Sequence, residues 1–173
     1  MNPPILNLAD VELQPRPPEY QPPGPIAERI EARLGRIGGL LGLHKLGCGL
    51  VVVAPGKQAF PFHSHRHNDE LFVVLAGQGE LRYGATRCAL REGDVIGCPA
   101  GGPETAHAIT NTGPTELRYL AISSQDLPEI CDYPDSGKFG IFDAPAPGVS
   151  AAAAPAFHFI SRAGQHLDYW DGE

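Results

Sequence analysis

The chain has 173 residues and a formal net charge of −7 at pH 7, from 13 Lys and Arg against 20 Asp and Glu. This length suits one domain with a single core, which can bury roughly two-thirds of the surface that the unfolded chain exposes. The acidic balance argues against nucleic acid and anionic membrane surfaces as partners, because both are bound mainly through clustered Lys and Arg.

The cysteines and the N-terminal sequence predict a cytoplasmic protein. The four cysteines form no C-x-x-C pair, and a chain of this length does not need disulfide bonds, so we expect reduced thiols. The first twenty residues lack both a basic start and a continuous apolar run, unlike a secretory signal. No stretch has the length needed to cross a bilayer, so no membrane segment is expected.

Residues 1–42 are predicted to form an extended arm and a short helix. Eight of the eighteen prolines precede residue 26, and such a proline run forms neither a helix interior nor a central strand. Ile26, Ile30 and Leu34 then recur every four residues among charged residues, which predicts a helix from Ile26 to Leu34. A helix this short must dock on another element.

Residues 43–124 show the pattern of an all-β barrel core. Short runs rich in β-branched and aromatic residues are separated by Gly, Pro, Asn and Asp at the intervals typical of a barrel or sandwich. These runs are LHKLGCGLVVVA, FPFHSH, ELFVVLAG, GELRYG, RCALREGD, DVIGCPA, TAHAITN and ELRYLAIS. Helical periodicity is absent here.

Residues 125–173 are expected to form a C-terminal extension that packs on the barrel or on a partner subunit. The stretch 144–156 is rich in Ala and Pro and indicates a connector. The run FHFISR after it predicts one more strand. Trp170 is the expected anchor of the C-terminal end, because large aromatic rings are rarely left in water.

Three histidines and one glutamate carry the chemistry of a metal site. Alternate side chains of a strand share one face, so His63 and His65 point the same way. Residues 66–69 have turn chemistry, and Glu70 begins the next strand. His107 can supply a third imidazole from TAHAITN. Nitrogen and oxygen donors of this kind suit divalent transition metals.

The same residues resemble the two motifs of the cupin family. The first motif, H-x-H, four residues, E, six residues, G, is matched by His63, His65, Glu70 and Gly77. The second motif, G-x5-P-x-G and then H-x3-N, is matched by Gly93, Pro99, Gly101, His107 and Asn111. The gap between Gly101 and His107 is longer than is usual in the family. The segments EICDYPDSGKFG and DYWDGE look like a group of small single-domain bacterial cupins that are mostly uncharacterised.

This resemblance implies a double-stranded β-helix, or jelly-roll barrel, with a metal ion held by His63, His65, Glu70 and His107. His67 is an alternative ligand, because it also lies two residues from His65. Only two residues would then separate it from Glu70, too few for the turn, and an exposed turn residue is the favoured interpretation.

Strand alternation also predicts the surroundings of the metal. Counting from Glu70 and His107, the residues expected on the metal face are Phe72, Val74, Thr105 and Ile109, which makes the pocket mainly apolar. Phe60 and Phe62 should point outward and form an apolar patch that a second copy covers in a homodimer.

Three imidazoles and one carboxylate leave two positions free on a six-coordinate ion, where a small-molecule ligand can bind. Iron, manganese, nickel, cobalt and zinc all accept these donors, so we expect one divalent transition metal of unspecified identity. The leading hypothesis is a metal-dependent oxygenase, isomerase or lyase acting on a small polar or aromatic metabolite, with its catalytic residues unidentified. The alternative is a non-catalytic module that binds a small molecule through the metal.

Overall fold

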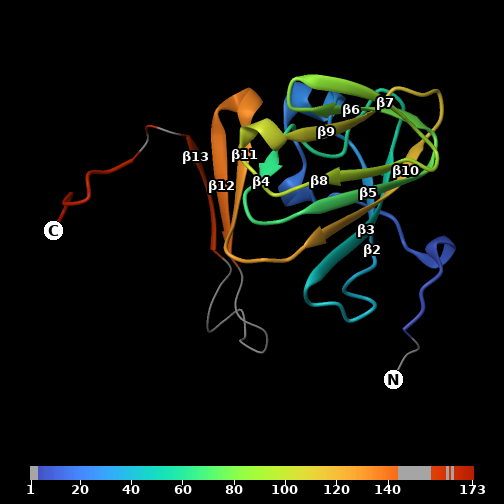
Figure 1. The fold of residues 1–173 in the computed structure, drawn as a ribbon, viewed down its shortest axis with the longest axis horizontal. Helices are drawn as coiled ribbons and strands as arrows, with labels where there is room; N and C mark the ends of the chain where they lie inside the picture. The colour runs from blue at the N-terminus through green and yellow to red at the C-terminus, as the bar shows by residue number, and fades with distance from the viewer. Residues whose placement is uncertain (1–3, 144–156, 163, 165) are drawn as a thin grey trace.

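The chain folds almost entirely into β-strands (Figure 1). The computed structural model describes residues 4–143, 157–162, 164 and 166–173, so the expected connector 144–156 lies outside them. The strands are β1 (Gln14–Pro15), β2 (Arg33–Arg36), β3 (Leu46–Val53), β4 (Ser64–His65), β5 (Glu70–Ala76), β6 (Gln78–Tyr83), β7 (Thr86–Arg91), β8 (Val95–Cys98), β9 (His107–Asn111), β10 (Leu117–Ser124), β11 (Glu129–Tyr133), β12 (Lys138–Asp143) and β13 (Phe157–Arg162). The predicted all-β class is confirmed.

Three sheets build the barrel. The largest has the order β1-β2-β3-β10-β5-β8, a second has β7-β6-β9, and a third has β13-β12-β11-β4. Figure 1 shows β11, β12 and β13 standing together at one end of the molecule, beside β4. Each run proposed from the sequence contributes a strand, although FPFHSH contributes only the two residues of β4.

The largest of three buried apolar clusters in the described residues includes Phe72 and Val74, and strand alternation places Glu70 beside it. Along β5, Phe72 and Val74 are buried, whereas Leu71 between Glu70 and Phe72 is exposed. Glu70 points to the same face as Phe72 and Val74, because residues two apart share a face. The carboxylate therefore lies at the end of an apolar wall, where a charged group needs close partners.

The helix expected from Ile26 to Leu34 is not formed. A 3-10 helix covers only Gly24–Glu28, and Leu34 lies in β2, which pairs antiparallel with β3. Pairing with the exposed edge of β3 satisfies the backbone groups of β2, and Gly35 in this strand disfavours a helix. The other 3-10 helices are Leu8–Asp10, Pro18–Tyr20, Pro103–Thr105 and Pro134–Ser136. In the part of the chain that the structure describes, no helix has the length and apolar character needed to span a membrane.

The C-terminal region contributes two strands, β11 and β12, that were not expected. β11 pairs with β4 so that Cys131 lies opposite His65. The predicted strand FHFISR is present as β13 and pairs with β12. Trp170, in contrast, is 72% exposed and contacts the ring of Tyr169. Figure 1 shows the C-terminal end running away from the sheets, so Trp170 does not anchor it within one chain.

Gly77, between β5 and β6, is required by both its backbone angle and its surroundings. Its φ is +88°, and a Cβ atom there would lie 2.5 Å from the carbonyl oxygen of Glu116. We expect Gly77→Ala to lower the free energy of unfolding by more than the roughly 1–3 kcal/mol typical of a strained backbone conformation, because backbone atoms must also move. Urea unfolding measures the loss.

Gly93→Ala is the matched control for this prediction. Gly93 has a φ of +90°, but no atom lies within 4 Å of the position of an added Cβ. Its substitution therefore introduces the backbone strain without the close contact. Equal losses of stability in the two variants would contradict the role assigned to the contact with Glu116.

Candidate metal centre

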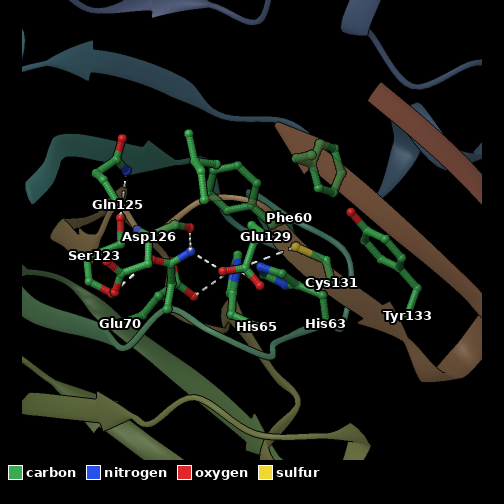
Figure 2. A pocket seen from close by; sticks show the side chains of 14 residues that line it. Phe60, His63, His65, Glu70, Ser123, Gln125, Asp126, Glu129, Cys131 and Tyr133 are labelled. Carbon is green, nitrogen blue, oxygen red and sulfur yellow. Dashed lines mark hydrogen bonds and ion pairs between the residues drawn. The ribbon is translucent and has the colours of Figure 1, made fainter. Parts of the chain in front are cut away.

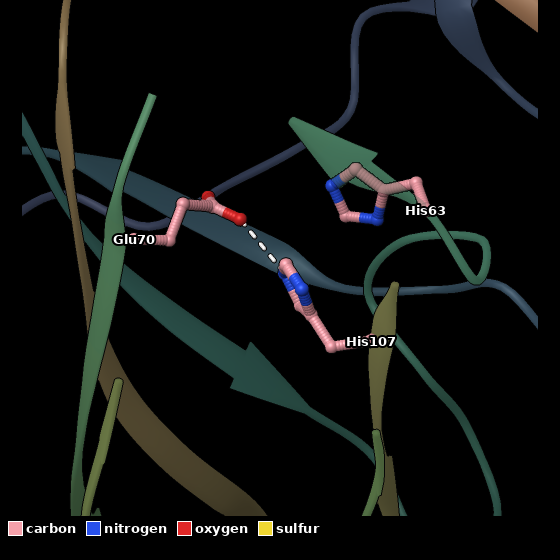
Figure 3. Close-up of side chains that lie close together, drawn as sticks. All are labelled: His63, Glu70 and His107. Atoms are coloured by element: carbon pink, nitrogen blue, oxygen red, sulfur yellow. Dashed lines mark hydrogen bonds and ion pairs between the residues drawn. The ribbon is translucent and has the colours of Figure 1, made fainter. Parts of the chain in front are cut away.

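The three histidines and the glutamate that the sequence singled out lie together. Nε2 of His107 lies 2.8 Å, and Nε2 of His65 lies 3.3 Å, from the same oxygen of Glu70, Oε2. His63, Glu70 and His107 each bring one potential ligand atom to within 4.8 Å of the others (Figure 3). The ring centroid of His63 is 4.9 Å from that of His65 and 5.0 Å from that of His107. Three donors, from His63, Glu70 and His107, thus face one point, and His65 joins them through Glu70 while also lying near Glu129 and Cys131.

Backbone pairing brings these side chains together. His63 and His107 form an antiparallel bridge, in which each backbone N–H donates to the other carbonyl, at 3.2 and 2.8 Å. The long gap before His107 is taken up by the 3-10 helix Pro103–Thr105, while Gly101 N–H donates to the carbonyl of His65 at 2.8 Å. The additional residues therefore form a local turn and leave His107 beside His63.

The Nδ1 atom of each imidazole has a partner away from Glu70. These partners are the carbonyl of Pro61 at 2.8 Å from His63, the carbonyl of Thr105 at 3.3 Å from His107, and Sγ of Cys131 at 3.4 Å from His65. A carbonyl can only accept, so His63 and His107 carry their proton on Nδ1 when neutral. In this neutral form Nε2 carries a lone pair, as a metal ligand needs, and for His107 that form requires loss of the proton shared with Glu70.

Burial and neighbouring groups shift the pKa values in the cluster. Burial lowers the pKa of His63 to about 4, so this imidazole is neutral at pH 7. Burial also acts to lower the pKa of His65, but hydrogen bonds with Cys131 and Glu70 outweigh it and raise the pKa to about 10. Burial acts to raise the pKa of Glu70, yet hydrogen bonds with His107 and His65 hold it well below its usual range.

The cluster fits a divalent cation. Glu70 is ionised and largely enclosed, and without a metal the proton on His65 provides its counter-charge. A cation bound by Nε2 of the histidines and by the carboxylate would replace that proton and satisfy all four donors. The donor types and their placing make His63, Glu70 and His107 candidate metal ligands, and His65 stays a predicted fourth ligand.

A cavity of about 370 Å³ opens beside the cluster, and Figure 2 shows the side chains around it. Its polar lining includes His63, His65, Glu70, Asp126, Glu129 and Tyr133. Phe60, Leu127 and Phe142 supply apolar surface. Most of the cavity surface is apolar, in the way that strand alternation predicts, although other residues supply it, and the wall also carries ionisable groups besides the candidate ligands.

The residues expected to line the pocket lie elsewhere. Phe72, Val74 and Ile109 belong to the buried core, where the ring centroid of Phe72 is 5.5 Å from that of His107. Thr105 is in a 3-10 helix and donates to the carbonyl of Gly102. None of these four lines the cavity beside the described ligand cluster. Phe72 and the carbonyl of Thr105 contact His107 on the side away from this cavity.

The prediction that Phe60 and Phe62 form an outward apolar patch is wrong. Phe62 is buried against Ala106 and Ala108, and Phe60 lines the cavity. The alternation fails here because only Ser64 and His65 of this run form a strand. His67 is exposed, as expected for a turn residue.

Sequence reasoning missed three residues of β11 on the cavity wall, Glu129, Cys131 and Tyr133. Oε1 of Glu129 accepts a hydrogen bond from Arg66 N–H at 3.0 Å and lies 3.9 Å from Nδ1 of His65. The ring of Tyr133 stacks on His63 with the centroids 6.2 Å apart, and burial raises the pKa of its phenol to about 12. The period-two spacing of these three residues in EICDY is the signal that could have revealed them.

Comparison with known protein families and curated proteins gives two matches. Residues 49–123 match the family described as Cupin domain. An oxalate-binding protein from Thermotoga maritima is 29% identical over 68 residues, which make up 39% of this chain. The chain spans about half, 54%, of the length of that relative.

Solved structures extend the similarity to nearly the whole chain. A cupin-superfamily sugar phosphate isomerase from Silicibacter pomeroyi has a TM-score of 0.75 at 22% identity and covers 96% of this chain and 98% of its own. A candidate sugar phosphate isomerase from Acidithiobacillus ferrooxidans has a TM-score of 0.61 at 29% identity, covering 64% and 70%. A predicted oxalate decarboxylase from Thermotoga maritima has a TM-score of 0.56 at 19% identity, covering 70% and 99%.

Proposed function

We propose that this protein, a small bacterial-type cupin with the double-stranded β-helix fold, is a divalent-metal-dependent enzyme acting on a small polar metabolite. His63, His65, Glu70 and His107 are the proposed metal ligands. One observation carries the proposal: the donors of His63, Glu70 and His107 converge beside a cavity, lined in part by His63, His65 and Glu70, that also holds ionisable groups which are not proposed ligands. A site that only binds needs shape and hydrogen bonds, whereas catalysis needs a group that moves a proton.

Residues of this chain can bind the substrate and handle a proton. A bound divalent ion would supply Lewis-acid polarisation of a substrate oxygen. The phenol of Tyr133, whose pKa burial raises to about 12, stays protonated at neutral pH and can donate a hydrogen bond to that substrate. The carboxylates of Asp126 and Glu129 line the same cavity and are the candidate proton acceptors.

Isomerisation of a hydroxy-carbonyl compound is the reaction class that we favour within this proposal. Such a reaction moves a proton between adjacent carbons while the substrate oxygens stay bound, which matches a metal site flanked by carboxylates. Similarity to the Acidithiobacillus ferrooxidans candidate sugar phosphate isomerase supports this class. Similarity to the Silicibacter pomeroyi structure adds support for the fold.

The second candidate is a module that binds a small carboxylate without turnover. Similarity to the oxalate-binding protein of Thermotoga maritima favours it. Metal-loaded protein, incubated in D₂O with aldose phosphates and with oxalate, distinguishes the two candidates by proton NMR and calorimetry. Metal-dependent exchange of the C2 proton supports the isomerase. Tight oxalate binding without exchange or turnover of the sugars would identify the binding module.

Cys131 is proposed to support the metal site through His65. Its Sγ lies 3.4 Å from Nδ1 of His65, so replacing it by Ala removes the partner that orients this ring. We expect Cys131→Ala to weaken metal binding by about 10–100-fold, the range found for residues that support metal ligands. Competition with a chelator measures the change. The exposed Cys88 provides the matched control, Cys88→Ala, which should keep full affinity.

A homodimer is proposed to form through β13. This strand is at the edge of its sheet, and Phe157, Phe159 and Ile160 on it are 54, 45 and 48% exposed. An apolar edge strand is usually covered by another chain. Light scattering should give a dimer mass for the full chain and a monomer mass for a chain cut after residue 144, which lacks β13 and retains the metal ligands. The same mass for both would contradict the proposal.

A further inference from the structure

A second cavity adjoins the metal cavity. Its volume is about 700 Å³, and it shares Tyr133 and Phe142 with the cavity at the metal site. The N-terminal arm forms one wall, and β12 and β13 contribute to another. Figure 2 shows Tyr133 beside His63 at one end of the metal cavity, and the ring of Tyr133 lines both spaces.

The two cavities have opposite charge. Three basic residues line the second cavity, Arg16, Arg29 and Lys138. Its one carboxylate, Asp135, is already bound by both guanidinium nitrogens of Arg82, at 2.7 and 2.9 Å. The lining of the metal cavity contains three carboxylates and no Lys or Arg. The positive cavity is notable because the chain as a whole carries a formal charge of −7.

No direct ion pair of the described residues neutralises the three basic side chains, although Arg29 is near enough to Asp135 to help lower the pKa of that carboxyl, after the larger effect of Arg82. Nη2 of Arg16 donates to the carbonyl of Ala59 at 2.7 Å, and Nζ of Lys138 lies 5.5 Å from the ring centroid of Tyr133. Within the described residues, no ion pair joins Arg16, Arg29 or Lys138 to a carboxylate closer than 4.0 Å. Clustered cations repel one another, and an oxyanion placed between them relieves the repulsion and accepts their hydrogen bonds.

We propose that this second cavity binds the phosphate group of a small phosphorylated metabolite. The guanidinium of Arg29 offers paired donors that match a phosphate, and Lys138 adds a point charge. The inference that phosphate binds here depends only on the residues of this second cavity. The assignment of the other end of the same molecule to the metal cavity, past Tyr133 and Phe142, rests on the proposed function.

Calorimetry on the full chain, first stripped of metal with a chelator, tests the phosphate site without involving the metal. Inorganic phosphate and an aldose phosphate should both bind, and the unphosphorylated aldose should not. The double variant Arg29→Gln/Lys138→Gln should bind phosphate about tenfold or more weakly, as expected when charge-assisted hydrogen bonds are lost. Arg36→Gln/Lys45→Gln is the matched control, because it removes the same charge from exposed residues that do not line this cavity.

Each outcome decides one part of the inference. Absence of phosphate binding, or equal weakening in both double variants, would overturn the phosphate site. Binding of inorganic phosphate but not of the aldose phosphate would show that the cavity binds the free ion. That result would overturn the assignment of a phosphorylated metabolite as the ligand. If the aldose phosphate does bind, loading the protein with metal should tighten that binding. If phosphate binding is intact and metal adds nothing, the result counts against the proposed metal-dependent function and leaves the phosphate site standing.

Discussion

Replacing either His65 or Glu70 by Ala is expected to remove most of the bound metal. Oε2 of Glu70 is the oxygen that Nε2 of both His65 and His107 face, at 3.3 and 2.8 Å. Loss of a direct ligand should weaken metal binding beyond the 10–100-fold range of supporting residues, by about a hundredfold or more. Elemental analysis of protein purified without chelators, followed by chelator competition, measures the loss.

His67→Ala is the matched control for these ligand variants. His67 is exposed and lies in the turn between His65 and Glu70, so it tests an imidazole of the same motif that does not face the cluster. We expect this variant to keep nearly the metal content of the unmodified chain. Near-stoichiometric metal in His65→Ala or Glu70→Ala would refute the proposed ligand set, and loss of metal in His67→Ala would show that the wrong histidine had been assigned.

Metal affinity is expected to rise steeply with pH. In the metal-free protein the pKa of His65 is about 10, against 6.5 for an ordinary histidine, so a metal that binds Nε2 must displace a proton at neutral pH. The pKa of His63 is about 4, and this ring therefore releases no proton in that range. Displacement of one proton raises the apparent affinity by about tenfold for each pH unit.

Chelator competition at pH 6.5, 7.5 and 8.5 measures this slope, and calorimetry in buffers of different ionisation enthalpy counts the released proton. Affinity that does not change with pH would contradict the assignment of a protonated His65 to the metal-free site.

The stability of the metal-free protein should change in the opposite direction. The folded-state pKa of His65 is above its unfolded value, so its contribution to stability is fully present below about pH 6.5. That contribution is lost as the pH rises towards 10. The melting temperature of metal-free protein should therefore fall across this interval, and bound metal should remove the fall because it replaces the proton.

Local sequence was sufficient to identify the strands between residues 43 and 124 and to group His63, His65 and Glu70, whereas His107 was added by the resemblance to the second cupin motif. The spacing of His63, His65 and Glu70 allows a strand, a turn and a second strand to carry three donors to one point. Alternation of apolar residues predicted strands such as β5 and β10 because one face of each must be buried. These features depend on neighbours along the chain, which a sequence records directly.

Tertiary pairing decided what the sequence by itself could not. The four-residue apolar spacing near Leu34 predicted a helix, but the open edge of β3 made a strand the better partner for the backbone. Alternation showed which way Phe72 and Ile109 point, and the structure placed them in the core. Cys131 meets His65 only because β11 pairs with β4. The sequence determined on which face of its strand each side chain lies. Pairing between segments far apart in the chain determined which element covers that face.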